Sequence, residues 1–261
     1  MSKQTTLQEA VTTVEGGSLL ALGGNALNRA PIAFVLELIQ QQKKGLSVIK
    51  TAGALDVDLL ATAKSIDSVY GGYIGFEMFG LAPSYRKGVQ NQEIIVHEHA
   101  CASVIAGLRA SIYGVSFQPI NGFQGSDLPK WGGLVRKVTC PFTEQEIAVV
   151  PALRPDVTII HANIVDEKGN AYIDGSIYED LIMVKAGKRV IVTTEKIVSS
   201  KDWTVTPQIP GFLVEGVVLA EKGAAPGSCA PLYAINKNEV TTYLQNPDRY
   251  LMKQKEASTH V

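Results

Sequence analysis

A glycine pair after an apolar run is the feature of this sequence best suited to bind an anion. The run covers residues 19–22, Gly23, Gly24 and Asn25 follow it, and Pro31 opens a second apolar stretch. Such a run is typical of a buried parallel strand, and proline suits the first turn of a helix. Because glycine lets a ligand approach the backbone closely, we expect the N–H groups of Gly23, Gly24 and Asn25 to be free for an oxyanion or a phosphate.

Two nucleotide-binding motifs are excluded at this turn. The spaced third glycine of a dinucleotide fingerprint and the Gly-Lys-Ser/Thr of a P-loop are both missing. NAD and ATP are therefore not expected as ligands. A turn between strand and helix that binds no ligand is the alternative reading of the same residues.

The run His97, Glu98 and His99 has the residue types of a metal or acid–base cluster. Two histidines two positions apart share a face only on a strand, and a helix that begins near Glu98 would separate them. We therefore expect no metal site here. Glu98 itself falls at a junction between strand and helix, where its charge would either stabilise the helix N-terminus or contact a ligand.

Short β-rich runs alternate with stretches of helical spacing along most of the chain. The β-rich runs cover residues 46–50, 68–73, 93–96, 158–161, 190–194 and 212–219. A four-residue repeat predicts a helix over residues 100–112, with Gly114 at its C-terminal end. The pattern predicts an α/β fold with an open, largely parallel sheet covered by helices, as a single domain over 1–261. Glycines and prolines make residues 115–150 an irregular excursion, expected on the substrate side.

Three further expectations concern local structure. His161 ends an apolar strand, and we expect it to be buried and hydrogen-bonded rather than catalytic. Asp166, Gly169 and Asn170 suit a tight turn in which Asn170 is left-handed or caps the next segment. The apolar strand over residues 213–219 has little chain after it to cover it, so we expect an exposed edge that invites association.

Composition and charge exclude several classes of protein. The chain has 261 residues, 46% hydrophobic and 19% charged, with a net charge of -1, which indicates a globular protein without a nucleic-acid-binding surface. No long apolar segment or signal peptide is visible, so we expect a cytoplasmic protein that does not enter membranes. Cys101, Cys140 and Cys229 are far apart, which favours reduced packing residues over disulfides or structural zinc.

Several stretches give the chain a resemblance to a known enzyme family. The glycine turn with Arg29, Ala30 and Pro31 resembles the glycine signature of the α subunit of family I CoA transferases, although the family has an aromatic residue in place of Asn25. Residues 150–162 are similar to the family's proline-aspartate strand, and residues 166–171 match its Asp-x-x-Gly-Asn turn. The resemblance continues through 190–198, covers roughly 7–244, and is best against the A subunit of glutaconate CoA-transferases.

The resemblance implies a NagB/RpiA-like fold and an enzyme that moves CoA from an acyl-CoA to a free carboxylic acid through a glutamyl-CoA thioester. In this family the glutamate belongs to a Ser-Glu-Asn-Gly or related motif of the B (β) subunit, and Ser-Glu-Asn-Gly does not occur in this chain. The chain is then expected to be active only with a B subunit. The resemblance also implies a CoA thioester substrate, no tightly bound cofactor, and oxyanion donors at Gly23, Gly24 and Asn25.

The resemblance also implies that two regions of the chain bind substrate. Residues 118–127 are similar to the family's Gly-x-Gly-Ser/Thr-Asp segment near the acyl pocket. This implies contacts at Asn121, Gly122, Gly125 and Ser126, with an exposed Ω-loop as the alternative. The A subunits of the family have an acidic residue where Glu98 stands, so Glu98 is also expected to bind substrate.

Two other functions fit the same residues. One is a CoA-thioester hydrolase or ring-cleaving C–C bond hydrolase on the same scaffold, although the acidic position of that branch aligns nearer Cys101 than Glu98. The other is a binding or regulatory subunit without catalysis, which the missing glutamate permits. Neither the acyl group nor the choice between an αβ and an α2β2 assembly follows from the sequence.

Overall fold

The main sheet confirms the expected open, largely parallel architecture. The computed structural model describes residues 2–123, 126–128 and 134–259. Seven of the eight strands of this sheet are parallel, in the order β11 (Gly216–Leu219), β10 (Arg189–Val198), β8 (Val157–Asp166), β1 (Leu19–Leu22), β2 (Leu46–Gly53), β3 (Ile66–Ile74), β4 (Ile95–Glu98). The eighth, β9 (Ala171–Tyr172), pairs antiparallel with β8.

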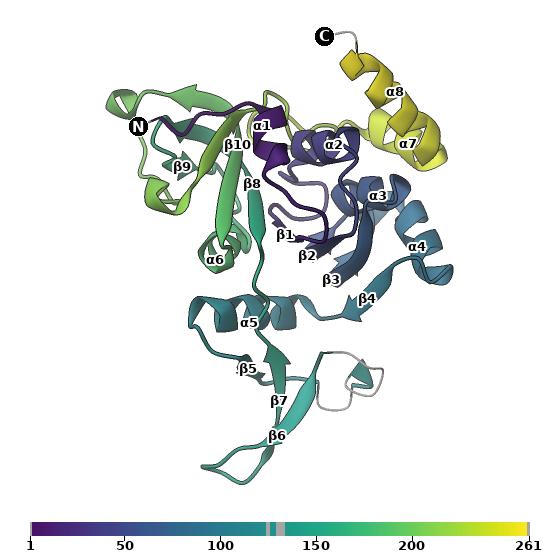
Figure 1. Ribbon diagram of the computed structural model, residues 1–261, viewed down its shortest axis with the longest axis vertical. Helices are drawn as coiled ribbons and strands as arrows, with labels where there is room; N and C mark the ends of the chain where they lie inside the picture. Colours follow the sequence, from purple (N-terminus) through teal and green to yellow (C-terminus); the bar gives the residue numbers. More distant parts are fainter. Residues whose placement is uncertain (1, 124–125, 129–133, 260–261) are drawn as a thin grey trace.

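Alternate residues of the central strands enter two separate hydrophobic cores. In β1, Leu20 and Leu22 join one core and Ala21 joins the other, so an unbroken apolar run is required. The first core packs under α1 (Leu7–Thr12), α2 (Ile32–Gln40), α3 (Leu55–Thr62), α4 (Pro83–Gln90), α7 (Lys237–Gln245) and α8 (Pro247–Thr259). The second core packs under α5 (Cys101–Ile112) and α6 (Asp180–Ala186). Figure 1 shows the two groups of helices on opposite sides of the sheet.

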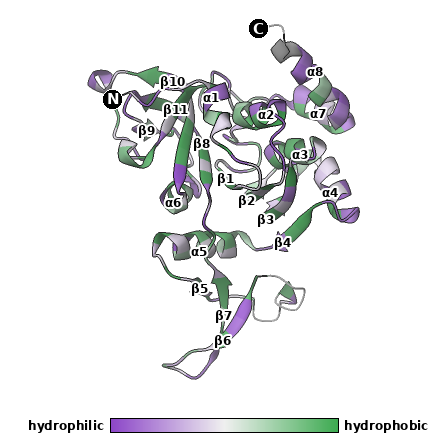
Figure 2. Cartoon of the chain, viewed as in Figure 1, coloured by the Kyte–Doolittle hydropathy of each residue, from purple (hydrophilic) through white to green (hydrophobic). Residues whose placement is uncertain are grey.

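The hydropathy of the elements follows this layering. The strands of the main sheet are mostly hydrophobic, whereas α7 and α8 are rich in hydrophilic residues (Figure 2). The helix expected over 100–112 is confirmed as α5, and Gly114 beyond its end has the left-handed φ of +68°. The strand expected over 212–219 begins only at Gly216, because residues 211–213 form a short 3-10 turn.

The edge strand β11 is not left open. The backbone N–H of Val217 donates to the carbonyl oxygen of Lys3, and Thr5 donates back to Val217, both at 2.9 Å. Lys3 Nζ also donates to the carbonyl oxygens of Gly211 and Val214 at 2.6 Å. The expectation that the chain has little left to cover this edge is therefore wrong, because the N-terminal segment covers it.

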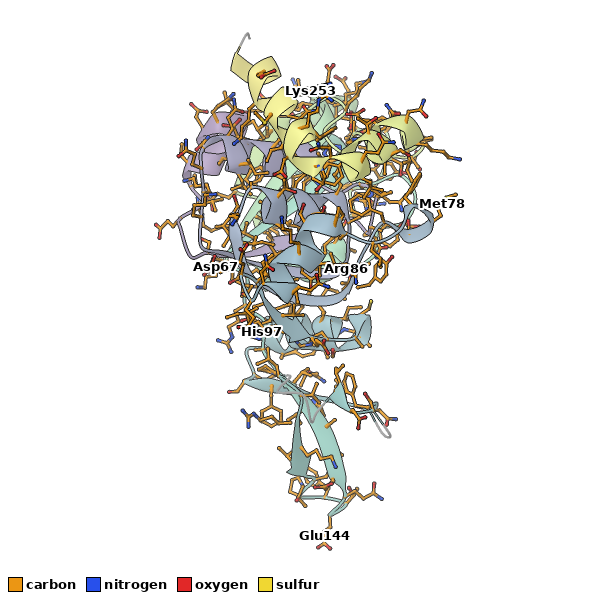
Figure 3. All side chains as sticks on the ribbon, turned by 90° about the vertical axis from the view of Figure 1, so that its right-hand side faces the viewer. Asp67, Met78, Arg86, His97, Glu144 and Lys253 are labelled. Carbon is orange, nitrogen blue, oxygen red and sulfur yellow. The ribbon has the colours of Figure 1, made fainter. Side chains whose placement is uncertain are left out.

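The excursion expected near 115–150 contains a second, antiparallel sheet in the order β5 (Phe117–Ile120), β7 (Glu146–Pro151), β6 (Arg136–Thr139). We call these strands and their described connections the arm, and the rest of the chain the body. The arm packs on α5 through Ala106, Val135 and Val150. Glu144 marks the tip of the arm, at the opposite end of the molecule from Lys253 (Figure 3).

The turn after β8 is tight, as expected, but a different residue is left-handed. Asp166 accepts hydrogen bonds from the N–H groups of Lys168 and Asn170 and from the side-chain amide of Asn170. Gly169 has the positive φ of +89°, whereas Asn170 does not. Glycine takes this conformation at lower cost, which explains the difference.

Candidate functional site at the carboxyl edge of the sheet

The strand order reverses between β1 and β8. The chain progresses outward through β2, β3 and β4 on one side, and through β10 and β11 on the other. In open α/β sheets, ligands bind in the crevice beyond the carboxyl ends of the strands at such a reversal. The glycine turn of residues 23–25 lies at this position, directly after β1.

The N–H groups of the glycine turn are not free. Each donates at 2.8 Å to an acceptor of the same chain: Gly23 to the carbonyl oxygen of Ile159, Gly24 to Oδ1 of Asp180, Asn25 to the carbonyl oxygen of Asn28. The prediction of bare N–H groups here is therefore wrong. The physical reason is that a buried turn must satisfy its own donors, and α6 delivers a carboxylate for the purpose.

Two buried ion pairs hold this turn. Arg29 pairs with Asp180 at 2.8 Å, and its guanidinium also donates to the carbonyl oxygens of His161 and Ser176, both at 2.8 Å. On the other side, Lys50 pairs with Asp56 at 3.0 Å. The Lys50 ammonium also donates to the carbonyl oxygens of residues 22–24, which caps the end of β1.

A further acidic residue, Glu179, lies beside these pairs. It immediately precedes α6 and is 6% exposed. Burial raises the pKa of its carboxyl group and Asp180 adds to the effect, whereas Lys50 and Arg29 act in the opposite direction. Sequence reasoning missed Lys50, Glu179 and Asp180; the one available signal was a lysine inside the apolar strand β2.

His161 is fully buried and hydrogen-bonded, as expected. Its Nδ1 lies 2.9 Å from Thr193 Oγ1, and its Nε2 lies 2.7 Å from Glu195 Oε1. Burial alone would raise the pKa of Glu195, but hydrogen bonds from His161, Tyr233 and the N–H of Lys222 outweigh it and lower that pKa. This network ties the chain beyond β11 to the interior of β8 and β10, and the expectation that His161 ends its strand is wrong, because β8 continues to Asp166.

The same network includes a possible set of metal ligands. Donor atoms of His161, Glu195 and Cys229 lie within 4.8 Å of one another. Burial raises the pKa of the Cys229 thiol to about 12, and Glu195 adds to this effect. The Cys229 thiol is thus held in its protonated form, and Nε2 of His161 and Oε1 of Glu195 are already hydrogen-bonded to each other.

Glu98 ends β4 and is exposed, at the expected junction with α5. The two flanking histidines are not separated, because α5 begins only at Cys101. The ring of His97 stacks on Tyr70 at 4.2 Å, and that of His99 lies 6.4 Å from the same ring. Burial lowers the pKa of His99 to about 4, and His97 contributes to this shift. Because both rings lie beside Tyr70 and α5 begins only after them, the expectation that a helix separates the two histidines is wrong.

The expected substrate loop follows β5 in the arm. Asn121, Gly122 and Ser126 are exposed, whereas Gly125 lies outside the described residues. The flanking residues Ile120, Phe123 and Leu128 pack toward α5. Within residues 2–123, 126–128 and 134–259, no hydrogen bond or ion pair joins Glu98 to Asn121, Gly122 or Ser126. The helix α5 is the element that connects the two regions.

The described part of the chain contains no helix long and apolar enough to cross a membrane.

Comparison with curated proteins finds relatives along most of the chain. The A subunit of the 3-oxoadipate CoA-transferase of Pseudomonas knackmussii is 36% identical over 90% of this chain and 83% of the relative. The cholesterol ring-cleaving hydrolase IpdA subunit of Rhodococcus jostii is 30% identical over 85% of this chain and 79% of the relative. An uncharacterized protein of Archaeoglobus fulgidus is 32% identical over 93% of this chain, which spans only 55% of that relative.

Solved structures share the whole fold. Glutaconate CoA-transferase of Acidaminococcus fermentans superimposes with a TM-score of 0.89 and 26% identity, covering 99% of this chain and 87% of that one. A variant of the decarboxylase AibA/AibB gives a TM-score of 0.90 and 30% identity, with both chains covered completely. The family model described as Coenzyme A transferase matches residues 4–220. By sequence and by fold, the chain belongs to the coenzyme A transferase family.

Proposed function

We propose that the chain is the A subunit of a heteromeric enzyme that transfers CoA from an acyl-CoA to a free carboxylic acid. The observation that carries the proposal is the 36% identity to a CoA-transferase A subunit over 90% of the chain. The superposition on glutaconate CoA-transferase, over 99% of the chain, supports the same assignment.

The chemistry of the transfer explains why a partner is required. A carboxylate is a weak nucleophile toward a thioester, so the reaction benefits from a covalent intermediate, exclusion of water and stabilisation of the tetrahedral oxyanion. We propose that the nucleophilic glutamate belongs to a B subunit, since this chain lacks the Ser-Glu-Asn-Gly sequence. The CoA thioester is a substrate in this scheme, and no tightly bound cofactor takes part.

A second candidate is a CoA-thioester hydrolase or C–C bond hydrolase with the same subunit structure. The 30% identity to the ring-cleaving hydrolase subunit favours it. The two functions differ in what takes the acyl group: a carboxylate in the transferase and water in the hydrolase.

The test uses the chain purified together with its B subunit. After incubation with candidate acyl-CoAs, mass spectrometry should find a CoA thioester on the B subunit, and CoA release into product should require a free carboxylic acid. Product formation without any acid acceptor, and without the thioester, would instead support the hydrolase. The isolated chain should have no transferase activity, and activity in that sample would contradict the division of the site between two subunits.

A further inference from the structure

Five large apolar side chains are exposed beside the glycine turn. Tyr73 lies near the carboxyl end of β3, and Met78 and Leu81 lie in the connection from β3 to α4. Tyr178 precedes α6, and Leu232 lies in the connection from β11 to α7. We call these five side chains the apolar rim. Exposed apolar groups that gather at one place mark a surface that another molecule covers.

The end of β2 joins the glycine turn to the first three residues of the apolar rim. The N–H of Ala26 donates to the carbonyl oxygen of Ala52 at 2.8 Å, and the N–H of Gly75 donates to the carbonyl oxygen of Gly53 at 2.9 Å. Because β1, β2 and β3 are parallel, their carboxyl ends lie at one edge of the sheet. This part of the apolar rim therefore borders the candidate site.

Arg29 joins the glycine turn to the other two residues of the apolar rim. Its N–H donates at 2.7 Å to the carbonyl oxygen of Ser228, which precedes Leu232 in the same connection. Its guanidinium lies 5.9 Å from the centroid of the Tyr178 ring and donates at 2.8 Å to the carbonyl oxygen of His161 in β8. The apolar rim thus borders the turn on its β2 side and on its β8 side.

Residues 75–81 are held in place by contacts within the chain. The N–H of Phe76 donates to the carbonyl oxygen of Gly80 at 2.8 Å, and the buried Phe76 ring stacks on Tyr243 of α7 with 5.7 Å between the ring centroids. Met78, between Phe76 and Gly80, is 82% exposed and projects from the molecule (Figure 3). An exposed side chain on a segment that is already ordered binds a partner at a lower cost in conformational entropy.

We propose that the apolar rim is the surface on which the B subunit docks, an inference that rests on the proposed transfer of CoA. The attacking glutamate belongs to the B subunit in that scheme, and the candidate site lies at the carboxyl edge of the sheet, so the B subunit has to cover this edge. An apolar contact beside the site also excludes water, which would compete with the carboxylic acid for the acyl group. Met and Tyr are enriched in protein interfaces. A second copy of this chain would not supply the glutamate.

The test introduces Met78→Lys and Leu81→Lys together and measures binding to the purified B subunit by isothermal titration calorimetry. Because both side chains are exposed, the Tm of the isolated chain should change little. A lysine inside an apolar contact loses its water on binding, so the Kd should rise by about 30-fold or more. Met252→Lys in α8, which is 63% exposed and outside the apolar rim, should leave the Kd unchanged. Equal Kd values for the wild type and the double variant would overturn the inference.

Hydrogen exchange gives a second readout on the unaltered chain. Binding of the B subunit should slow exchange over residues 73–81 and near Leu232, and unchanged exchange in both segments would overturn the inference. If the B subunit binds through the apolar rim and no CoA is transferred, the proposed function fails and the docking surface stands. If the complex transfers CoA and the double variant binds as tightly as the wild type, the inference fails alone.

The oligomeric state of the isolated chain tests the competing occupant. If the wild type does not bind the B subunit, the inference and the proposed function both fail. If the isolated wild type is also a dimer that the double variant dissociates, the apolar rim belongs to a second copy of the chain, which overturns the inference as well. Analytical ultracentrifugation of the wild type, the double variant and Met252→Lys makes this comparison.

Discussion

The Cβ position of Gly24 is blocked by its own turn. Gly24 has a φ of +71°, and a Cβ there would lie 2.4 Å from the carbonyl oxygen of Asn28. Gly17 has a similar φ of +82°, but nothing lies within 4 Å of its Cβ position. Alanine at 24 therefore meets both the left-handed backbone cost and a collision, whereas alanine at 17 meets only the backbone cost.

We expect Gly24→Ala to lower the free energy of unfolding by about 2–4 kcal/mol, and Gly17→Ala by about 1–2 kcal/mol. Urea denaturation of both variants measures the difference. Equal losses would show that the turn can open to admit a methyl group. A loss of activity in a Gly24 variant would report on the fold of the turn, because its N–H is already bound to Asp180.

Removing one partner of the buried ion pair between Arg29 and Asp180 is expected to destabilise the protein strongly. Asp180→Asn leaves the buried guanidinium without its carboxylate, which typically costs about 3–5 kcal/mol. Glu215→Gln is the matched control, because Glu215 and Arg189 form a pair whose side chains are 53% and 35% exposed. That change should cost less than about 1 kcal/mol. Similar unfolding free energies for the two variants would contradict this account.

Local patterns were enough to predict the position of the candidate site but not its internal contacts. The turn at Gly24, the buried His161 and the junction at Glu98 each follow from residues adjacent in sequence. The bond that occupies the Gly24 N–H comes from Asp180, 156 positions away, and no local pattern links the two. The roles expected for Glu98, Asn121, Gly122, Gly125 and Ser126 in binding substrate stay predictions.

At the scale of elements, Asp58 of α3 joins two other helices. Its carboxylate accepts a hydrogen bond from Tyr243 Oη of α7 at 2.6 Å and from the backbone N–H of Tyr85 in α4 at 2.7 Å. Burial raises the pKa of Asp58 from 3.8 to about 6, against the hydrogen bonds that lower it. The folded protein therefore binds this proton more tightly than the unfolded chain does.

The contribution of Asp58 should make the protein less stable as pH rises from 3.8 to about 6, by roughly 3 kcal/mol. Above that window the loss is complete, and below it Asp58 is protonated in both states. Urea unfolding of the wild type and Asp58→Asn across this range isolates the effect, because the other titrating groups contribute equally to both. Parallel curves for the two proteins would rule out a raised pKa.

The elements themselves were predictable where a pattern is continuous and local. The strand β1 has an unbroken apolar run because residues on both of its faces are buried, and α5 has a regular four-residue repeat. The cover on β11 was not predictable, since Lys3 and Thr5 reach Val217 from the other end of the chain. Similarly, the prediction that a helix begins near Glu98 is wrong. Glu98 pairs with β3, so β4 extends through this residue and the helix begins after it.

At the scale of the whole molecule, the arm contacts the body through a small apolar cluster near its base. The cluster contains Ala106 of α5 together with Val135 and Val150 of the arm. The tip, residues 140–145, lies beyond it and is held by local backbone hydrogen bonds between Cys140 and Glu144 or Gln145. Phe142 at the tip is 92% exposed, so it contributes almost no burial to the fold.

Replacing residues 140–145 by Asn-Gly, which suits a two-residue hairpin turn, should therefore change the Tm by less than about 2 °C. Val150→Ala is the control within the same arm, because Val150 is fully buried at its base. Its cavity should lower the Tm by several degrees, at about 2–4 °C per kcal/mol for a chain of this size. Thermal unfolding of the two variants compares them directly. If the shortened tip were as damaging as the cavity, the tip rather than the base would be the part of the arm that stabilises the body.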